Sequence, residues 1–301
     1  NIGIIYNDLG EHNKAILFFK RAIQKNDQFY QAYFNLGNSF KALNKLNEAK
    51  DSYKKSIEIN TNYIEALNNL GIIYNEKKEY NKAIELYRKI IKINFNYTPA
   101  YNNLGNSLYQ DGQTQKAIEI FEKGINIDPK NYKALTDLSN AYKSQGKVDK
   151  SIDLLKQSIR INPDYAESYS YLGNIYADMG ELNTALKYFK LGLSKDNKLK
   201  SINYNIAMIL YKTNKLKEAV KFFEKSKHDD FEERILQCHY KLGEFDLFNA
   251  NLKKKINEEN NSRIIASLTA HASINLNQEN DYNFCKDPLN FIYKKKLKNQ
   301  K

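Results

Sequence analysis

Few residues in this chain could support metal or nucleophilic chemistry, and they are widely separated. The histidines are His12, His228, His239 and His271. His228 and Asp230 have the spacing of two ligands of a facial iron triad, but no further histidine lies in register with them. The two cysteines form no CxxC pair, and no glycine-rich loop precedes a lysine. We therefore expect no catalytic residue, no metal site and no cofactor in this chain.

Asparagine is the polar residue whose spacing is regular. It recurs at two positions three residues apart, which are neighbours on one face of a helix: Asn35, Asn38, Asn69, Asn103, Asn106, Asn140, Asn174 and Asn205. An asparagine amide donates and accepts hydrogen bonds, so a row of amides can pair with the backbone of an extended peptide. Asp137, Tyr171 and Met208 interrupt the row. The alternative is that asparagine merely fills exposed positions in an Asn-rich protein.

These asparagines belong to a repeat of about 34 residues. One register of the repeat holds Gly3, Gly37, Gly71, Gly105, Ser139, Gly173 and Ala207. A small residue follows twelve positions later, and an aromatic residue or leucine sixteen positions later. A period of this length predicts a solenoid of helix pairs. We expect a first helix over 98–111 and a second over about 114–127, with Gly105 facing Ala117 so that the two backbones approach closely.

The pattern resembles the tetratricopeptide repeat (TPR). The fourth repeat carries it nearly throughout, at Tyr101, Leu104, Gly105, Ala117, Phe121, Gly124 and Pro129. The resemblance implies an all-α fold, a right-handed α-solenoid (superhelix) of antiparallel helix pairs whose first helices line the concave wall. The asparagines are similar to those of the TPR region of O-GlcNAc transferase. That similarity implies that the eight asparagines line a peptide-binding groove.

The repeats divide the chain into three expected parts. Residues 1–233 hold seven TPR repeats of about 34 residues each, the first of them truncated, so the natural N-terminus is expected to lie upstream. Residues 234–260 form a degenerate shortened repeat, and residues 261–301 form a capping helix followed by a basic tail or linker.

The end of the chain has a second resemblance. Its residues are His271, Tyr282, Phe284, Cys285, Asp287, Pro288, Leu289 and Phe291. They resemble the segment that precedes the oxygenase domain in bacterial TPR proteins with a 2-oxoglutarate/Fe(II) oxygenase domain. The resemblance implies a catalytic domain after Lys301. The alternative is a tail whose aromatic residues dock onto the last repeat.

The composition excludes some partners. The formal net charge is +12, but nearly all of it is lysine mixed with Glu and Asp, which is typical of solvated helical faces. Only five arginines are present, so we do not expect nucleic-acid binding. No apolar run approaches the roughly 18 residues that span a bilayer, so we expect no membrane span. Two cysteines without a disulfide framework favour a cytoplasmic location, with an upstream targeting segment left open.

The expected function is a protein–protein interaction scaffold that binds an extended peptide or partner protein in the concave groove, with no small-molecule substrate. The first alternative is a substrate-recruiting arm of an oxygenase or glycosyltransferase whose catalytic domain lies outside this chain. The second is binding of nucleic acid or an acidic surface by lysine-rich faces. We expect that replacing Asn69, Asn103 and Asn106 by alanine weakens peptide binding and leaves melting nearly unchanged.

Overall fold

The computed structural model describes residues 2–257, and this range contains α-helices and no strand. In chain order the helices are α1 (Ile2–Asp8), α2 (His12–Lys25), α3 (Tyr30–Ala42), α4 (Leu46–Ile59), α5 (Ile64–Glu76), α6 (Tyr80–Ile93), α7 (Thr98–Gln110), α8 (Thr114–Ile127), α9 (Tyr132–Ser144), α10 (Val148–Ile161), α11 (Ala166–Asp178), α12 (Leu182–Lys195), α13 (Lys200–Lys212), α14 (Leu216–Ser226), α15 (Phe231–Leu242) and α16 (Phe245–Asn257). The expected capping helix and tail, residues 261–301, lie outside the described residues.

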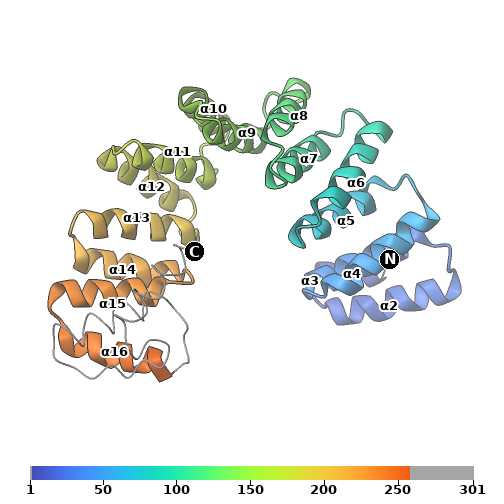
Figure 1. Ribbon diagram of the computed structural model, residues 1–301. Helices are drawn as coiled ribbons and strands as arrows, with labels where there is room; N and C mark the ends of the chain where they lie inside the picture. Colours follow the sequence, from blue (N-terminus) through green and yellow to red (C-terminus); the bar gives the residue numbers. More distant parts are fainter. Residues whose placement is uncertain (1, 258–301) are drawn as a thin grey trace, which may run out of the picture. The chain divides into compact units, whose positions relative to one another are not determined.

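The chain folds as two compact units, Asn1–Pro163 and Asp164–Lys301. Unit 1 contains α1 to α10, and the described part of unit 2 contains α11 to α16. In both units each odd-numbered helix packs antiparallel against the even-numbered helix that follows it (Figure 1). We call these the first and second helix of a pair. The expected all-α fold, a solenoid of antiparallel helix pairs, is confirmed. The first helix expected at 98–111 ends one residue earlier, at Gln110, and the second helix expected at 114–127 matches α8.

The repeated glycine makes room for an aromatic ring of the second helix. A Cβ atom added at Gly105 would lie 2.5 Å from Cε1 of Phe121, so the glycine faces this ring. The expected contact of Gly105 with Ala117 stays a prediction. Gly37 faces Tyr53 in the same way, and in unit 2 Gly173 faces Phe189. The first helix therefore accepts a residue that costs it about 1 kcal/mol because the second helix then buries a large ring against its backbone.

The turn inside each pair has a fixed left-handed residue. In unit 1 the residues with positive φ at this position are Gly10, Asn44, Lys78, Gly112 and Gly146, and in unit 2 they are Gly180, Asn214 and Gly243. From Gly10 to Asn214, consecutive members of this series lie one repeat apart. Glycine and asparagine tolerate the left-handed conformation, whereas a lysine does so only at a cost. Lys78, with a φ of 59°, is therefore the strained member of the series.

Most connections from one pair to the next begin with an asparagine or aspartate; the connection from α14 to α15 begins with Lys227. At Asn26, Asn60, Asn94, Asp128 and Asp196, the side-chain oxygen accepts a hydrogen bond from the backbone N–H two residues later, over 2.8–3.2 Å. The backbone of the first such residue, Asn26, is extended and its own N–H still bonds to Ala22. Each of these second helices thus ends in an Asx turn, which directs the chain into the next pair.

Candidate functional site

The eight predicted asparagines all lie on first helices and are all partly buried. Unit 1 holds Asn35 and Asn38 on α3, Asn69 on α5, Asn103 and Asn106 on α7, and Asn140 on α9; unit 2 holds Asn174 on α11 and Asn205 on α13. The repeat places them here because their positions straddle the glycine that packs against the second helix.

Hydrogen bonds join asparagines of α3 and α5. Nδ2 of Asn69 donates to Oδ1 of Asn38 over 3.0 Å. The same oxygen accepts from the hydroxyl of Tyr53 over 2.7 Å. The ring of Tyr53 packs against Gly37. The same tyrosine therefore both fills the core of one pair and orients Asn38, which accepts the hydrogen bond from the next pair.

The bonding continues through α7 to α9. Nδ2 of Asn103 donates to Oδ1 of Asn68 over 2.9 Å. From the same helix, Asn106 and Asn102 donate to Oδ2 of Asp137, over 2.8 Å and 3.1 Å. The side chains of four successive first helices are therefore linked on one face of unit 1. We call this set the amide row; it consists of Asn38, Asn68, Asn69, Asn102, Asn103, Asn106 and Asp137.

The amide row includes residues that the sequence reasoning missed. Asn68 and Asn102 were not among the predicted site residues, although each directly precedes a predicted asparagine. The doublets Asn68-Asn69 and Asn102-Asn103 were the available signal. Two adjacent helical positions are about 100° apart, so one amide of a doublet reaches the preceding first helix and the other the following one.

The remaining predicted asparagines differ in their contacts. In unit 2, Nδ2 of Asn205 donates to Oδ1 of Asn174 over 2.7 Å, which repeats the link between α3 and α5. Asn35 instead donates to the backbone carbonyl of Gln31 within its own helix, over 2.9 Å. Asn140 makes no hydrogen bond through its side chain in the described part of unit 1. Neither Asn35 nor Asn140 therefore bridges two helix pairs.

Three amides of the row donate to a neighbouring first helix and leave their oxygens open. The amides of Asn69, Asn103 and Asn106 each spend an N–H on a neighbouring first helix, while their Oδ1 atoms accept no hydrogen bond from residues 2–257. The row consequently offers open amide oxygens, which suit a ligand that brings N–H groups, together with amide N–H groups that remain free to donate. These bonds also revise the expected behaviour of the triple alanine variant. We now expect it to lose about 0.5–1.5 kcal/mol of stability for each missing bond.

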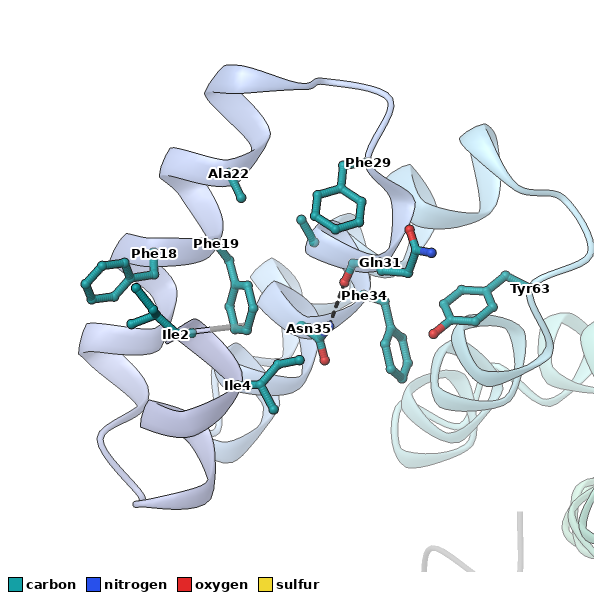
Figure 2. Close-up of a pocket in the computed structure, with 12 residues that line it drawn as sticks. Ile2, Ile4, Phe18, Phe19, Ala22, Phe29, Gln31, Phe34, Asn35 and Tyr63 are labelled. Atoms are coloured by element: carbon teal, nitrogen blue, oxygen red, sulfur yellow. Dashed lines mark hydrogen bonds between the residues drawn. The ribbon is translucent and has the colours of Figure 1, made fainter.

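A groove of about 510 Å³ lies at the N-terminal helices of unit 1 (Figure 2). It is lined mainly by apolar side chains of α1, α2 and α3, by Phe29 and Tyr63 from the connections before α3 and α5, and by the polar residues Asn35 and Gln31. The lining includes Phe19 and Ala32, which are buried, so the groove continues the core of the first pair. Of the eight predicted asparagines, only Asn35 borders it. The groove and the amide row are therefore separate features.

The described residues contain no group of three or more His, Cys, Asp and Glu side chains that could hold a metal ion. His228 and Asp230 lie together, with Nδ1 of the histidine 2.8 Å from the carboxylate. Arg234 and Tyr204 also donate to this carboxylate, over 2.9 Å and 3.0 Å. Burial alone would raise the pKa of Asp230, but these three hydrogen bonds together lower it. The carboxylate is thus a structural acceptor at the start of α15.

Between residues 2 and 257, every helix is too short or too polar to cross a lipid bilayer.

Comparison with known families gives one consistent match. Models described as tetratricopeptide repeat match residues 30–63, 64–97 and 98–131, and also 1–26, 166–198 and 201–227. A model described as TPR repeat matches residues 139–180. Among curated proteins, none matches the chain.

Several solved structures are similar to this chain at low identity. A tetratricopeptide repeat protein from Parabacteroides merdae is 21% identical, with a TM-score of 0.70, over 78% of this chain and 95% of that one. The APC/C hetero-tetramer Cut9-Hcn1 contains a chain that is 16% identical, with a TM-score of 0.65, over 77% of this chain and 47% of that one. MamA is 29% identical over 54% of this chain and 95% of its own, with a TM-score of 0.47.

Proposed function

The chain belongs to the tetratricopeptide-repeat family, and from this premise we propose that it is a protein-interaction scaffold that binds an extended polypeptide along its amide row. The observation that carries the proposal is the set of open amide oxygens: one N–H of Asn69 and one of Asn103 hold the side chain to a neighbouring first helix, while Oδ1 of each accepts no hydrogen bond from the described residues. A polypeptide in extended conformation presents backbone N–H groups whatever its side chains are.

The spacing of the row fits such a ligand. Packed helices lie about 8–10 Å apart, and an extended chain advances about 3.3 Å per residue. One acceptor for each helix pair therefore corresponds to one backbone N–H in about every three residues of the ligand. Because a single such bond contributes about 0.5–1.5 kcal/mol, affinity requires several pairs acting together.

The eight predicted asparagines take different parts in this proposal. Within unit 1 we assign the peptide contacts to Asn69, Asn103 and Asn106, whose oxygens are open, with Asn38 as the residue that orients Asn69. Asn35 and Asn140 extend the same face beyond the bonded row. In unit 2, Asn205 is the matching acceptor and Asn174 orients it.

The test uses the whole chain and a phage-displayed library of random twelve-residue peptides. Peptides selected on the wild-type chain are labelled with a fluorophore, and their Kd is measured by fluorescence anisotropy. The variant with Asn69→Ala and Asn103→Ala loses two acceptors, so we expect about tenfold weaker binding.

Two control variants separate binding from stability. Gly112→Ala strains an exposed turn and is expected to cost about 1 kcal/mol of stability without touching the row. Asn81→Ala removes an exposed amide from the second helix α6. Both controls should bind the peptides as the wild type does. The proposal is wrong if the double variant binds as tightly as the wild type, or if the library yields no peptide.

A further inference from the structure

Asp137 is the one charged residue at the repeated asparagine positions of the described first helices. It lies on α9 in the register that holds Asn35, Asn69 and Asn103 on earlier first helices. Its surroundings are nevertheless those of the row, because its hydrogen-bond partners are the amides of Asn102 and Asn106 on α7.

Three of the oxygens at Asp137 and its two amide partners accept no hydrogen bond from the described residues. Both amides donate to the same carboxylate oxygen, Oδ2, so Oδ1 accepts no hydrogen bond from residues 2–257. Oδ1 of Asn102 is buried and also has no partner in this range. Oδ1 of Asn106 is open as well. This part of the row therefore presents a carboxylate with open amide oxygens beside it, while one N–H of each amide is held by the carboxylate.

No cation neutralises this carboxylate within the described structure. The basic residue that acts on it is Lys133, which lies one turn earlier on α9, is exposed and forms no ion pair with it. Burial raises the pKa of Asp137, and the hydrogen bonds from Asn106 and Asn102 and the charge of Lys133 only partly oppose this effect. A partly buried carboxylate without a cation gains more from binding one than an exposed carboxylate does.

We propose that Asp137 binds a basic side chain, lysine or arginine, of the polypeptide held along the amide row. This inference rests on the proposed function and adds a side-chain preference to it. The amides select for extended backbone, while Asp137 fixes the register by requiring an ammonium or guanidinium group at one position. Lysine and arginine share the needed chemistry, since both present several N–H donors and a positive charge.

The test selects the same random twelve-residue library in parallel on three forms of the chain. These are the wild type, Asp137→Asn and the control Asp153→Asn. Asparagine at position 137 keeps an oxygen that accepts from Asn102 and Asn106, so only the charge is removed. Asp153 is exposed on the second helix α10 of the same unit, and its variant makes the same change in net charge. Circular dichroism verifies that all three are folded.

We expect peptides from the wild type and from Asp153→Asn to carry lysine or arginine at one fixed position, and peptides from Asp137→Asn to lack this preference. One selected peptide is then synthesised in two forms, one with its basic residue at the fixed position and one with norleucine at that position. Norleucine should weaken binding to the wild type about tenfold and leave binding to Asp137→Asn unchanged.

Three results would overturn the inference. Wild-type peptides without a fixed basic residue, or a basic preference that survives in Asp137→Asn, would leave backbone binding intact and remove the role of Asp137. A library that yields no peptide on any form would overturn the proposed function together with this inference. Comparing peptides that carry lysine with those that carry arginine at the selected position identifies which side chain is preferred.

Discussion

The hydroxyl of Tyr53 donates to Oδ1 of Asn38 over 2.7 Å, from the second helix of one pair to its first helix. Tyr87 occupies the same position one repeat later, but its buried hydroxyl has no hydrogen-bond partner among the described residues. The difference lies in the first helix, where Ile72 stands at the position of Asn38. The same tyrosine is thus satisfied in one pair and unsatisfied in the next.

We predict opposite effects for the two Tyr→Phe variants. Tyr53→Phe removes a satisfied hydrogen bond and should lower the free energy of unfolding by about 1 kcal/mol. Tyr87→Phe removes a hydroxyl that is buried without a partner, so stability should be unchanged or rise by about 1 kcal/mol. Urea unfolding of both variants measures this difference. Equal destabilisation would show that the hydrogen bond to Asn38 contributes nothing.

We predict that stability falls at alkaline pH. Burial raises the pKa of Tyr53 to about 12, with a hydrogen bond to Asn69 opposing the shift, and burial also raises the pKa of Tyr63 to about 12. In the unfolded chain a tyrosine ionises near pH 10. Because the folded pKa is the higher one, the stabilisation is complete below pH 10 and is lost as the pH rises toward 12.

The slope over this window should be up to about 1.4 kcal/mol per pH unit for each such tyrosine. Urea unfolding from pH 8 to pH 12 measures it. Tyr53→Phe should reduce the slope above pH 10 and leave the curve parallel to that of the wild type at pH 8–9. A slope unaffected by this variant would contradict the assignment.

We predict that Lys78→Gly stabilises the protein. Lys78 has a φ of 59° in a turn where three other repeats of unit 1 have glycine, and glycine removes the steric cost of this conformation. The free energy of unfolding should rise by about 1 kcal/mol. The reverse change, Gly112→Ala, should lower it by about as much, since an added Cβ meets no atom within 4 Å and only the backbone is strained. The idea fails if the two variants shift stability in the same direction.

We predict that Gly105→Ser is destabilising and that Phe121→Leu rescues it. The added side chain would meet the ring of Phe121, which is buried and has no room to move, so the cost should be about 1–3 kcal/mol. The pair Ser139 and Leu155 already occupies these two positions one repeat later, with both residues buried. A double-mutant cycle measured by thermal unfolding should therefore give a favourable coupling energy. Additive losses would contradict the proposed contact.

The period of the sequence was sufficient to predict the fold. A glycine at the same place in most repeats, with a small residue and an aromatic residue at fixed intervals after it, predicted the helix pairs and nearly the bounds of α7 and α8. Contacts inside a pair were harder to predict. Gly105 was expected to face Ala117 because both residues are small, but spacing along two helices did not indicate that the ring of Phe121 packs against the glycine.

For the candidate site, the sequence predicted which helices and which helix face carry the asparagines, but not the contacts between them. Register placed the asparagines on first helices, but it did not indicate that Asn69 bonds to Asn38 whereas Asn103 bonds to Asn68. That choice depends on how far neighbouring helices are offset, which is a property of packing. The Asx turns were also missed, although the recurring asparagine or aspartate that forms them was visible in the sequence. Whether the eight asparagines bind a peptide stays a prediction.

The Asx turns have a consequence for how proteins of this design change over evolution. Each of the five Asx turns is closed by its own side chain and the backbone two residues later, so the turn forms without contacts from distant parts of the chain. A duplication or deletion of one whole repeat that cuts at these turns would restore an identical joint. Under the proposed function, such an event would lengthen or shorten the bound polypeptide segment by about three residues and leave the other connections unchanged.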